Sequence, residues 1–155
     1  MLNTVIGFGN PLREDDGLGL RAAEFLEASG IDVLRCYQLT PELAVQVADS
    51  NLVIFLDAAG DLEPGTVRCT EVAAEQARAW THHLTPGQLL GFTGATFGRV
   101  PRAILIAGGA HSLDYGEELS LSAEQCAQQM AGVALLVMAG AKLHAGSVQA
   151  LGNHA

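Results

Sequence analysis

The sequence predicts an α/β fold: a three-layer α/β/α sandwich in which helices cover both faces of a mostly parallel, twisted sheet of about five strands. Short, almost fully apolar runs, typical of buried parallel strands, alternate along the chain with segments whose apolar residues recur at helical spacing. Glycine or proline stands at many of the boundaries between them. With 155 residues and no internal repeat, the chain is expected to form a single domain over residues 1–155.

The first half of the chain contains three predicted strands and two predicted helices. Residues 4–8 form an apolar run with a glycine near its end, which is typical of a buried strand that leads into a turn. Residues 17–29 carry apolar side chains at helical spacing, with Asp15 or Asp16 placed to cap the start and Gly30 placed to end the helix. The other expected elements are a strand at 31–37, a short helix at 41–48 capped by Thr40, and a strand at 52–56 ending at Asp57.

The second half continues this alternation of strands and helices. Residues 65–72 follow a Glu-Pro-Gly turn and alternate apolar with polar side chains, which predicts a strand at the edge of the sheet. Residues 86–97 predict a helix, although internal glycines weaken it, and residues 103–107 predict another buried strand. The final helix is predicted to begin at Ser122, which forms a capping-box pattern with the glutamine three residues later, and to reach about residue 144.

Composition and charge exclude several classes of protein. Hydrophobic residues make up 49% of the chain and charged residues 16%, which favours a sizeable core over disorder. A net charge of −9 disfavours nucleic acids and anionic membranes as partners. The longest apolar run is far shorter than the roughly 20 residues that span a bilayer. The first apolar strand has no basic flank before it, so we do not expect a signal peptide. The three cysteines are widely spaced, so we expect reduced thiols and a cytoplasmic protein.

The most informative segment is residues 7–19, Gly-Phe-Gly-Asn-Pro-Leu-Arg-Glu-Asp-Asp-Gly-Leu-Gly. A glycine turn after a buried strand normally prepares a helix N-terminus for phosphate. Here three consecutive acids follow the turn, and they would repel a phosphate and attract a cation. The segment therefore indicates a site for a metal or another positive group.

Acidic residues follow two of the predicted strands. In an open parallel sheet, ligands bind outside the carboxyl ends of the strands, so adjacent first and third strands would bring Asp16 and Asp57 to one rim, where His82 could join them. Carboxylate oxygen with imidazole nitrogen suits nickel, zinc or manganese. Isolated aspartates of this kind are more often helix caps. We therefore assign Asp15 either to the cap or to a supporting contact behind the metal ligands, and Asp16 to the metal, with the reverse left open. His82 and His83 alone would be solvated loop residues.

Residues 7–19 also resemble a known signature, Gly-x-Gly-Asn-x-Leu-x-x-Asp-Asp-Gly-x-Gly, of the nickel-iron hydrogenase maturation endopeptidases. The resemblance continues in the order of that family over nearly the whole chain. The further matching segments are 38–43, 56–58, 82–86 with the following leucine pair 89–90, 104–109 and 119–122.

The resemblance implies a cytoplasmic endopeptidase that removes the C-terminal extension of a hydrogenase large-subunit precursor after nickel insertion. It implies that Asp16, Asp57 and His82 contact the metal and that Asp16 and Asp57 are the catalytic candidates. The nickel would arrive with the precursor, no organic cofactor is expected, and the free protein is expected to be a monomer. Either the nickel acts as a Lewis acid or a carboxylate acts as general base, and the glycines of residues 7–17 would admit an extended peptide.

Some residues depart from the family pattern and leave alternatives open. Gln38 and Leu39 stand where many members have a glycine pair, and His83 competes with His82 as a ligand. A non-cleaving chaperone that binds nickel or the precursor is one rival function. A peptidyl-tRNA hydrolase is a weaker one, because its opening resembles residues 7–11 but its histidine segment is missing and a charge of −9 suits RNA poorly. The chain lacks a Gly-x-Ser-x-Gly motif for serine protease chemistry and a third glycine for dinucleotide binding.

Overall fold

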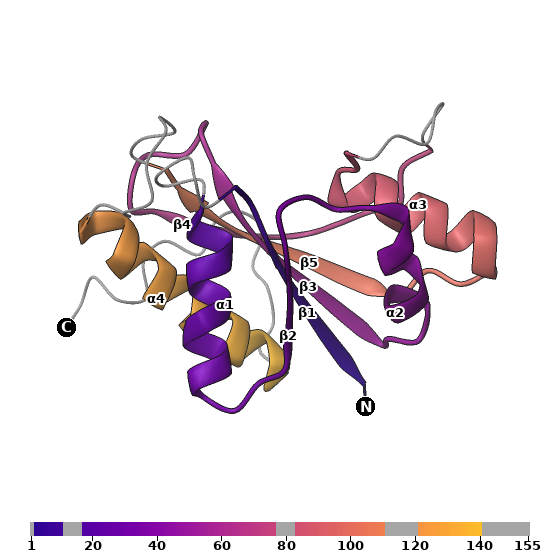
Figure 1. Cartoon of the computed structure of the whole chain (residues 1–155), viewed down its shortest axis with the longest axis horizontal. Helices are drawn as coiled ribbons and strands as arrows, with labels where there is room; N and C mark the ends of the chain where they lie inside the picture. The colour runs from indigo at the N-terminus through magenta and orange to yellow at the C-terminus, as the bar shows by residue number, and fades with distance from the viewer. Residues whose placement is uncertain (1, 11–16, 77–82, 111–120, 141–155) are drawn as a thin grey trace.

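The structure is a computed structural model, and it describes residues 2–10, 17–76, 83–110 and 121–140. Within these ranges, five strands and their helices follow one another along the chain, and only β3 and β4 are consecutive strands without a helix between them (Figure 1). In chain order, the elements are β1 (Asn3–Phe8), α1 (Leu18–Ala28), β2 (Val33–Cys36), the 3₁₀ helix η2 (Pro41–Leu43), α2 (Ala44–Ala48), β3 (Leu52–Ala59), β4 (Val67–Glu71), α3 (Pro86–Phe97), β5 (Arg102–Gly109) and α4 (Leu121–Met138).

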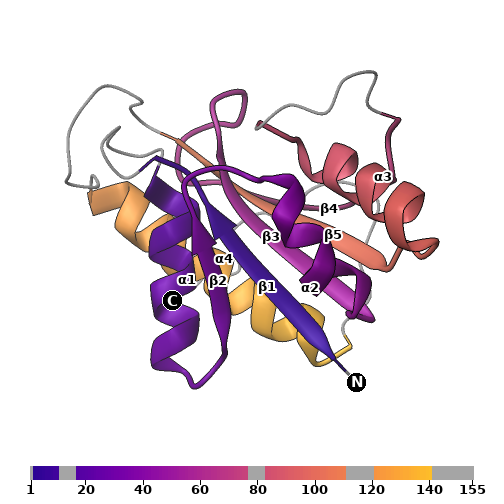
Figure 2. The same ribbon diagram turned by 45° about the vertical axis from the view of Figure 1, so that its right-hand side comes forward.

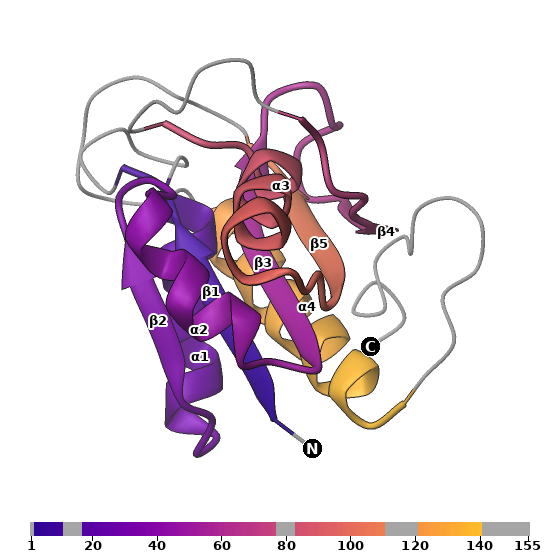
Figure 3. The same ribbon diagram turned by 90° about the vertical axis from the view of Figure 1, so that its right-hand side faces the viewer.

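The sheet has the strand order β2-β1-β3-β5-β4, which Figure 3 shows from left to right. The strands β2, β1, β3 and β5 are parallel, and β4 pairs antiparallel with β5. This confirms the mostly parallel sheet and the prediction that residues 65–72 contain an edge strand. The chain leaves β1 toward β2 on one side and later builds β3 and β5 on the other. The strand order therefore reverses between β1 and β3.

Helices cover both faces of the sheet and form a separate hydrophobic core on each, which confirms the three-layer sandwich (Figures 1 and 2). On one face, α1 and α4 pack against residues such as Val5, Ile54 and Ile104. On the other face, α2 and α3 pack against Ile6 and Phe55. Successive side chains of a strand point to opposite faces, so strands buried on both sides must be apolar throughout. No helix in the described ranges is both long and apolar enough to cross a membrane.

The ends of several elements refine the sequence predictions. Gly30 ends α1 as predicted: its φ is 85°, its N–H donates to the Glu27 carbonyl, and the N–H of Ile31 donates to the Leu26 carbonyl. These two bonds form a Schellman motif. Thr40 occupies the N-cap position of η2, but its side chain makes no capping hydrogen bond. Ser122 lies inside α4 rather than before it, so its assignment as the N-cap is wrong.

Candidate functional site

The carboxyl ends of β1 and β3 lie next to each other, as the metal-site prediction requires. Their last paired residues are Gly7 and Leu56, so Asp57 lies one residue beyond that pair. Asp57 is half-buried, and its Oδ1 accepts a hydrogen bond from the N–H of Ala58 at 2.8 Å. The structure therefore places Asp57 at the point where the strand order reverses, which is where ligands bind in open α/β sheets.

Asp57 does not end its strand, contrary to the sequence prediction. Strand β3 continues to Ala59, because β5 pairs with it as far as Gly109. Asp57 itself pairs with Ala107 of β5. The backbone before and after Asp57 is consequently held by parallel pairing with β5, which fixes the position of the Asp57 Cα atom.

The acidic residues after β1 fall outside the part of the chain that the structure describes. Asp15 and Asp16 lie outside the described residues, and so does their proposed contact with a metal. The N-cap position of α1 is held by Gly17, so neither aspartate occupies it and the capping assignment is wrong. Helix α1 begins at Leu18, whose side chain is fully buried in the core beneath the sheet's carboxyl edge.

The glycines around β1 serve a packing role that the sequence interpretation missed. A Cβ on Gly7 would lie 2.7 Å from the Gly19 carbonyl oxygen and 2.8 Å from the Cβ of Ala23. A Cβ on Gly19 would lie 2.2 Å from the Leu56 carbonyl oxygen and 2.7 Å from that of Phe8. The first turn of α1 thus rests directly on the backbones of β1 and β3. At Gly7 the space is filled by α1, so the expectation that this glycine admits a substrate is wrong.

The glycine at position 9 has a different role. Its φ is 147°, a conformation that favours glycine, and its N–H donates to the Cys36 carbonyl at 3.2 Å. This bond extends the pairing of β1 with β2 by one residue before the chain turns toward α1.

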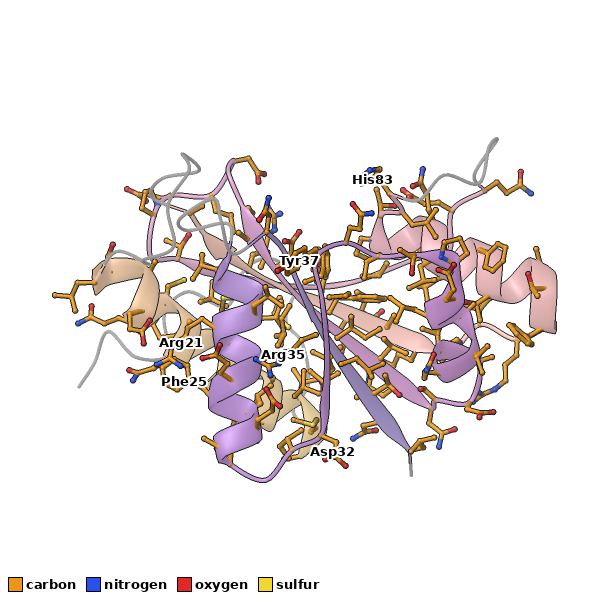
Figure 4. All side chains as sticks on the ribbon, viewed as in Figure 1. Arg21, Phe25, Asp32, Arg35, Tyr37 and His83 are labelled. Atoms are coloured by element: carbon orange, nitrogen blue, oxygen red, sulfur yellow. The ribbon has the colours of Figure 1, made fainter. Side chains whose placement is uncertain are left out.

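The histidine segment approaches this edge of the sheet from the side of α3. His82 lies outside the described residues, and His83 is exposed. The next residue, Leu84, forms an isolated antiparallel bridge with Leu39, and its N–H donates to the Leu39 carbonyl at 3.1 Å. Figure 4 shows His83 and Tyr37 on the upper side of the molecule. Strand β1 ends and helix α1 begins on the same side in Figure 1. Two segments that resemble the maturation endopeptidases are therefore neighbours in the fold.

The same segment is anchored a second time at the start of α3. The Thr85 hydroxyl accepts from the N–H of Gln88, and the Gln88 side chain accepts from the N–H of Thr85, which completes a capping box. Thr85 also donates to the Glu75 carboxylate at 3.0 Å. A Cβ on Gly91 would lie 1.8 Å from the Glu75 carbonyl oxygen, so this glycine admits the Glu75 backbone onto the helix.

The thiols are unsuited to nucleophilic catalysis. All three cysteines are free, as predicted, and Cys69 and Cys126 are buried. Burial raises the pKa of the Cys69 thiol to about 11 and also raises the pKa of Cys36. The reactive thiolate is therefore scarce at neutral pH.

Among the described residues, no group of three or more His, Cys, Asp or Glu side chains could hold a metal ion. Of the three predicted ligands, only Asp57 belongs to the described part of the chain. The carboxylate of Asp57 fits a hard or borderline cation, which is the chemistry that the sequence predicted for this edge.

The overall structure is similar to several solved proteins. The NiFe hydrogenase maturation protease HybD from Thermococcus kodakarensis matches with a TM-score of 0.71 and 24% identity, over 88% of this chain and 99% of that one. The hydrogenase maturating endopeptidase HybD from E. coli matches with a TM-score of 0.73 and 22% identity, over 90% and 94%. The chain has the fold of the hydrogenase maturation proteases.

A third structure carries the same fold. The hydrogenase 2 maturation peptidase from Thaumarchaeota archaeon SCGC_AB-539-E09 matches with a TM-score of 0.69 and 25% identity, over 90% of this chain and 99% of that one. The likeness to hydrogenase maturation proteases thus extends well beyond a single βαβ unit. The sequence matches no protein-family model and no curated protein.

Proposed function

We propose that this protein is a hydrogenase maturation endopeptidase, which removes the C-terminal extension of a nickel-iron hydrogenase large-subunit precursor after nickel insertion. The observation that carries the proposal is Asp57, which lies beside β1 at the reversal of strand order. The fold shared with the hydrogenase maturation proteases supports it. The reaction belongs in the cytoplasm, where three free thiols stay reduced.

In this proposal the nickel is part of the substrate. Asp57 contacts it from β3, Asp16 from the segment between β1 and α1, and His82 from the segment that precedes α3. No organic cofactor takes part. A carboxylate beside a cation stays ionised at neutral pH, and an ionised carboxylate serves either as metal ligand or as general base.

Two routes to peptide hydrolysis fit this arrangement. In the first, the nickel polarises the scissile carbonyl, and Asp16 and Asp57 hold the ion in place. In the second, Asp16 or Asp57 removes a proton from the attacking water while the nickel fixes the position of the bond. In both routes water adds to the carbonyl carbon, the C–N bond breaks, and the new amine takes up a proton.

The test is to incubate the protein with nickel-loaded and nickel-free precursor and to follow truncation by mass spectrometry. We expect cleavage of the nickel-loaded form alone. Equal cleavage of both forms would disprove recognition through nickel. Cleavage of neither form, with retained binding, would support the chaperone. The variants Asp16→Ala and His82→Ala should stop processing while the protein stays folded, whereas His83→Ala should have the smaller effect.

A further inference from the structure

Strand β2 forms one edge of the sheet, and its free side faces outward beside α1 (Figure 3). The Cys36 carbonyl accepts the N–H of Gly9, so the backbone groups of Cys36 point toward β1. Backbone groups of successive residues in a strand point to alternate sides, and those of Arg35 and Val33 therefore point away from the sheet. Neither residue has a backbone partner on that side among the described residues.

A groove of about 500 Å³ runs along this edge. Helix α1 lines it with Leu20, Glu24 and Glu27. Strand β2 lines it with Val33, Arg35 and Cys36, and the exposed Tyr37 follows directly after the strand. Figure 4 shows Arg35 between α1 and β2, with Asp32 and Tyr37 toward opposite ends of the strand. The open edge of β2 thus offers backbone hydrogen-bonding groups next to a groove whose other side is formed by α1.

The net charge of the protein favours a basic occupant, while the carboxylates beside the groove are paired but partly exposed. Arg35 is shared between Glu27, at 3.1 Å, and Glu24, at 3.6 Å. Glu24 also pairs with Arg21, yet 45% of its side chain and 38% of that of Glu27 remain exposed. The whole chain carries a net charge of −9, which attracts a basic segment and repels a second copy.

The groove also leads to the proposed site. Its Tyr37 end lies at the carboxyl edge of the sheet, beside Gly9. A strand added outside β2 would lie three strand spacings, or about 14 Å, from the level of Asp57 in β3. About four extended residues cover that distance.

We propose that an extended basic segment of the precursor adds to the edge of β2 as a further strand, and that about four residues connect this segment to the scissile bond. Main-chain hydrogen bonds to Val33 and Arg35 supply the affinity, and the net negative charge of the protein attracts the basic side chains. The inference rests on the proposed endopeptidase function and names how its substrate is held.

The test uses the two substitutions Arg35→Pro and Arg35→Ala. Both remove the guanidinium, but only proline removes the outward N–H, and a proline with its nitrogen toward solvent is tolerated on an edge strand. With nickel-loaded precursor, we expect KM to be about tenfold higher for Arg35→Pro than for Arg35→Ala, because one backbone bond is lost and the ring obstructs the incoming strand. Equal KM values for the two variants would overturn the proposal.

Hydrogen exchange on the unmodified protein gives a second readout that does not depend on the proline variant folding. Bound precursor should slow exchange of the Val33 and Arg35 amides by about tenfold or more, while the amides of the opposite edge strand β4 stay unchanged. No slowing in β2 would overturn the docking. Slowing that depends on protein concentration without precursor would overturn it too, because a second copy would then occupy the edge. Failure of the wild type to cleave any precursor would instead contradict the proposed function.

Discussion

The carboxyl edge of the sheet is supported in two different ways. On one side, α1 meets β1 and β3 backbone to backbone, at positions where Gly7 and Gly19 have no side chain. On the other side, the loop after β2 meets the segment before α3 through the bridge between Leu39 and Leu84, both of which are buried. The first contact depends on the absence of side-chain atoms and the second on their volume. The two sides should therefore respond very differently to small changes in residue size.

The largest effect is expected for Gly19→Ala. The new Cβ would lie 2.2 Å from the Leu56 carbonyl oxygen, and neither a strand backbone nor the first turn of a helix can move easily. We expect the free energy of unfolding to fall by about 3 kcal/mol or more, measured by urea denaturation.

The matched control for this variant is Gly132→Ala in α4. A Cβ at Gly132 would have no atom within 4 Å, so the same substitution should stabilise the protein by about 0.5–1 kcal/mol through helix propensity. If both glycine variants changed stability by the same amount, close backbone packing would not be the reason for Gly19.

A smaller loss is expected for Leu39→Ala on the other side. Leu39 is only 1% exposed, so truncation removes buried apolar surface and leaves a cavity, at a cost of about 2–4 kcal/mol. Leu121→Ala is the control, because that leucine is 78% exposed and its truncation should change stability by less than about 0.5 kcal/mol. A loss of similar size at both leucines would show that the buried side chain of Leu39 contributes little to this contact.

The smallest effect is expected at Thr85. Its hydroxyl accepts from the N–H of Gln88 at 3.1 Å and donates to Glu75 at 3.0 Å. Thr85→Ala removes both bonds and should lower the free energy of unfolding by about 1 kcal/mol, whereas Thr85→Ser keeps the hydroxyl and should lose less than half of that. An alanine variant as stable as the serine variant would argue against the cap as an anchor of the histidine segment.

Local signals in the sequence predicted most of the fold. Residues 86–97 were predicted as a helix and form α3 with the same bounds, because Pro86 and Gly98 mark its two ends. The edge strand β4 and the end of α1 at Gly30 likewise follow from nearby glycine and proline residues, whereas the antiparallel direction of β4 was not predicted. The end of β3 could not be read locally, because it depends on pairing with β5 far along the chain.

The site was predicted less completely than the fold. The position of Asp57 beside β1 is confirmed, since it needed only the strand order. The roles of Asp16 and His82 stay predictions. The packing role of Gly7 and Gly19 was missed because a glycine-rich turn is compatible both with close substrate approach and with close helix packing. The Leu39 bridge left no local signal, because its two halves are distant in the sequence.

The most direct measurement is the rate at which Asp57→Asn cleaves the nickel-loaded precursor. Asparagine keeps the shape of Asp57 and can still accept the Ala58 N–H, so the fold should be retained while the charge is lost. We predict a rate at least about a hundredfold lower than wild type. The matched control, Asp61→Asn, changes an aspartate that is 72% exposed and paired with Arg68, and it should cleave at the wild-type rate. Cleavage by Asp57→Asn at the wild-type rate would contradict the assignment of the site to the reversal of strand order.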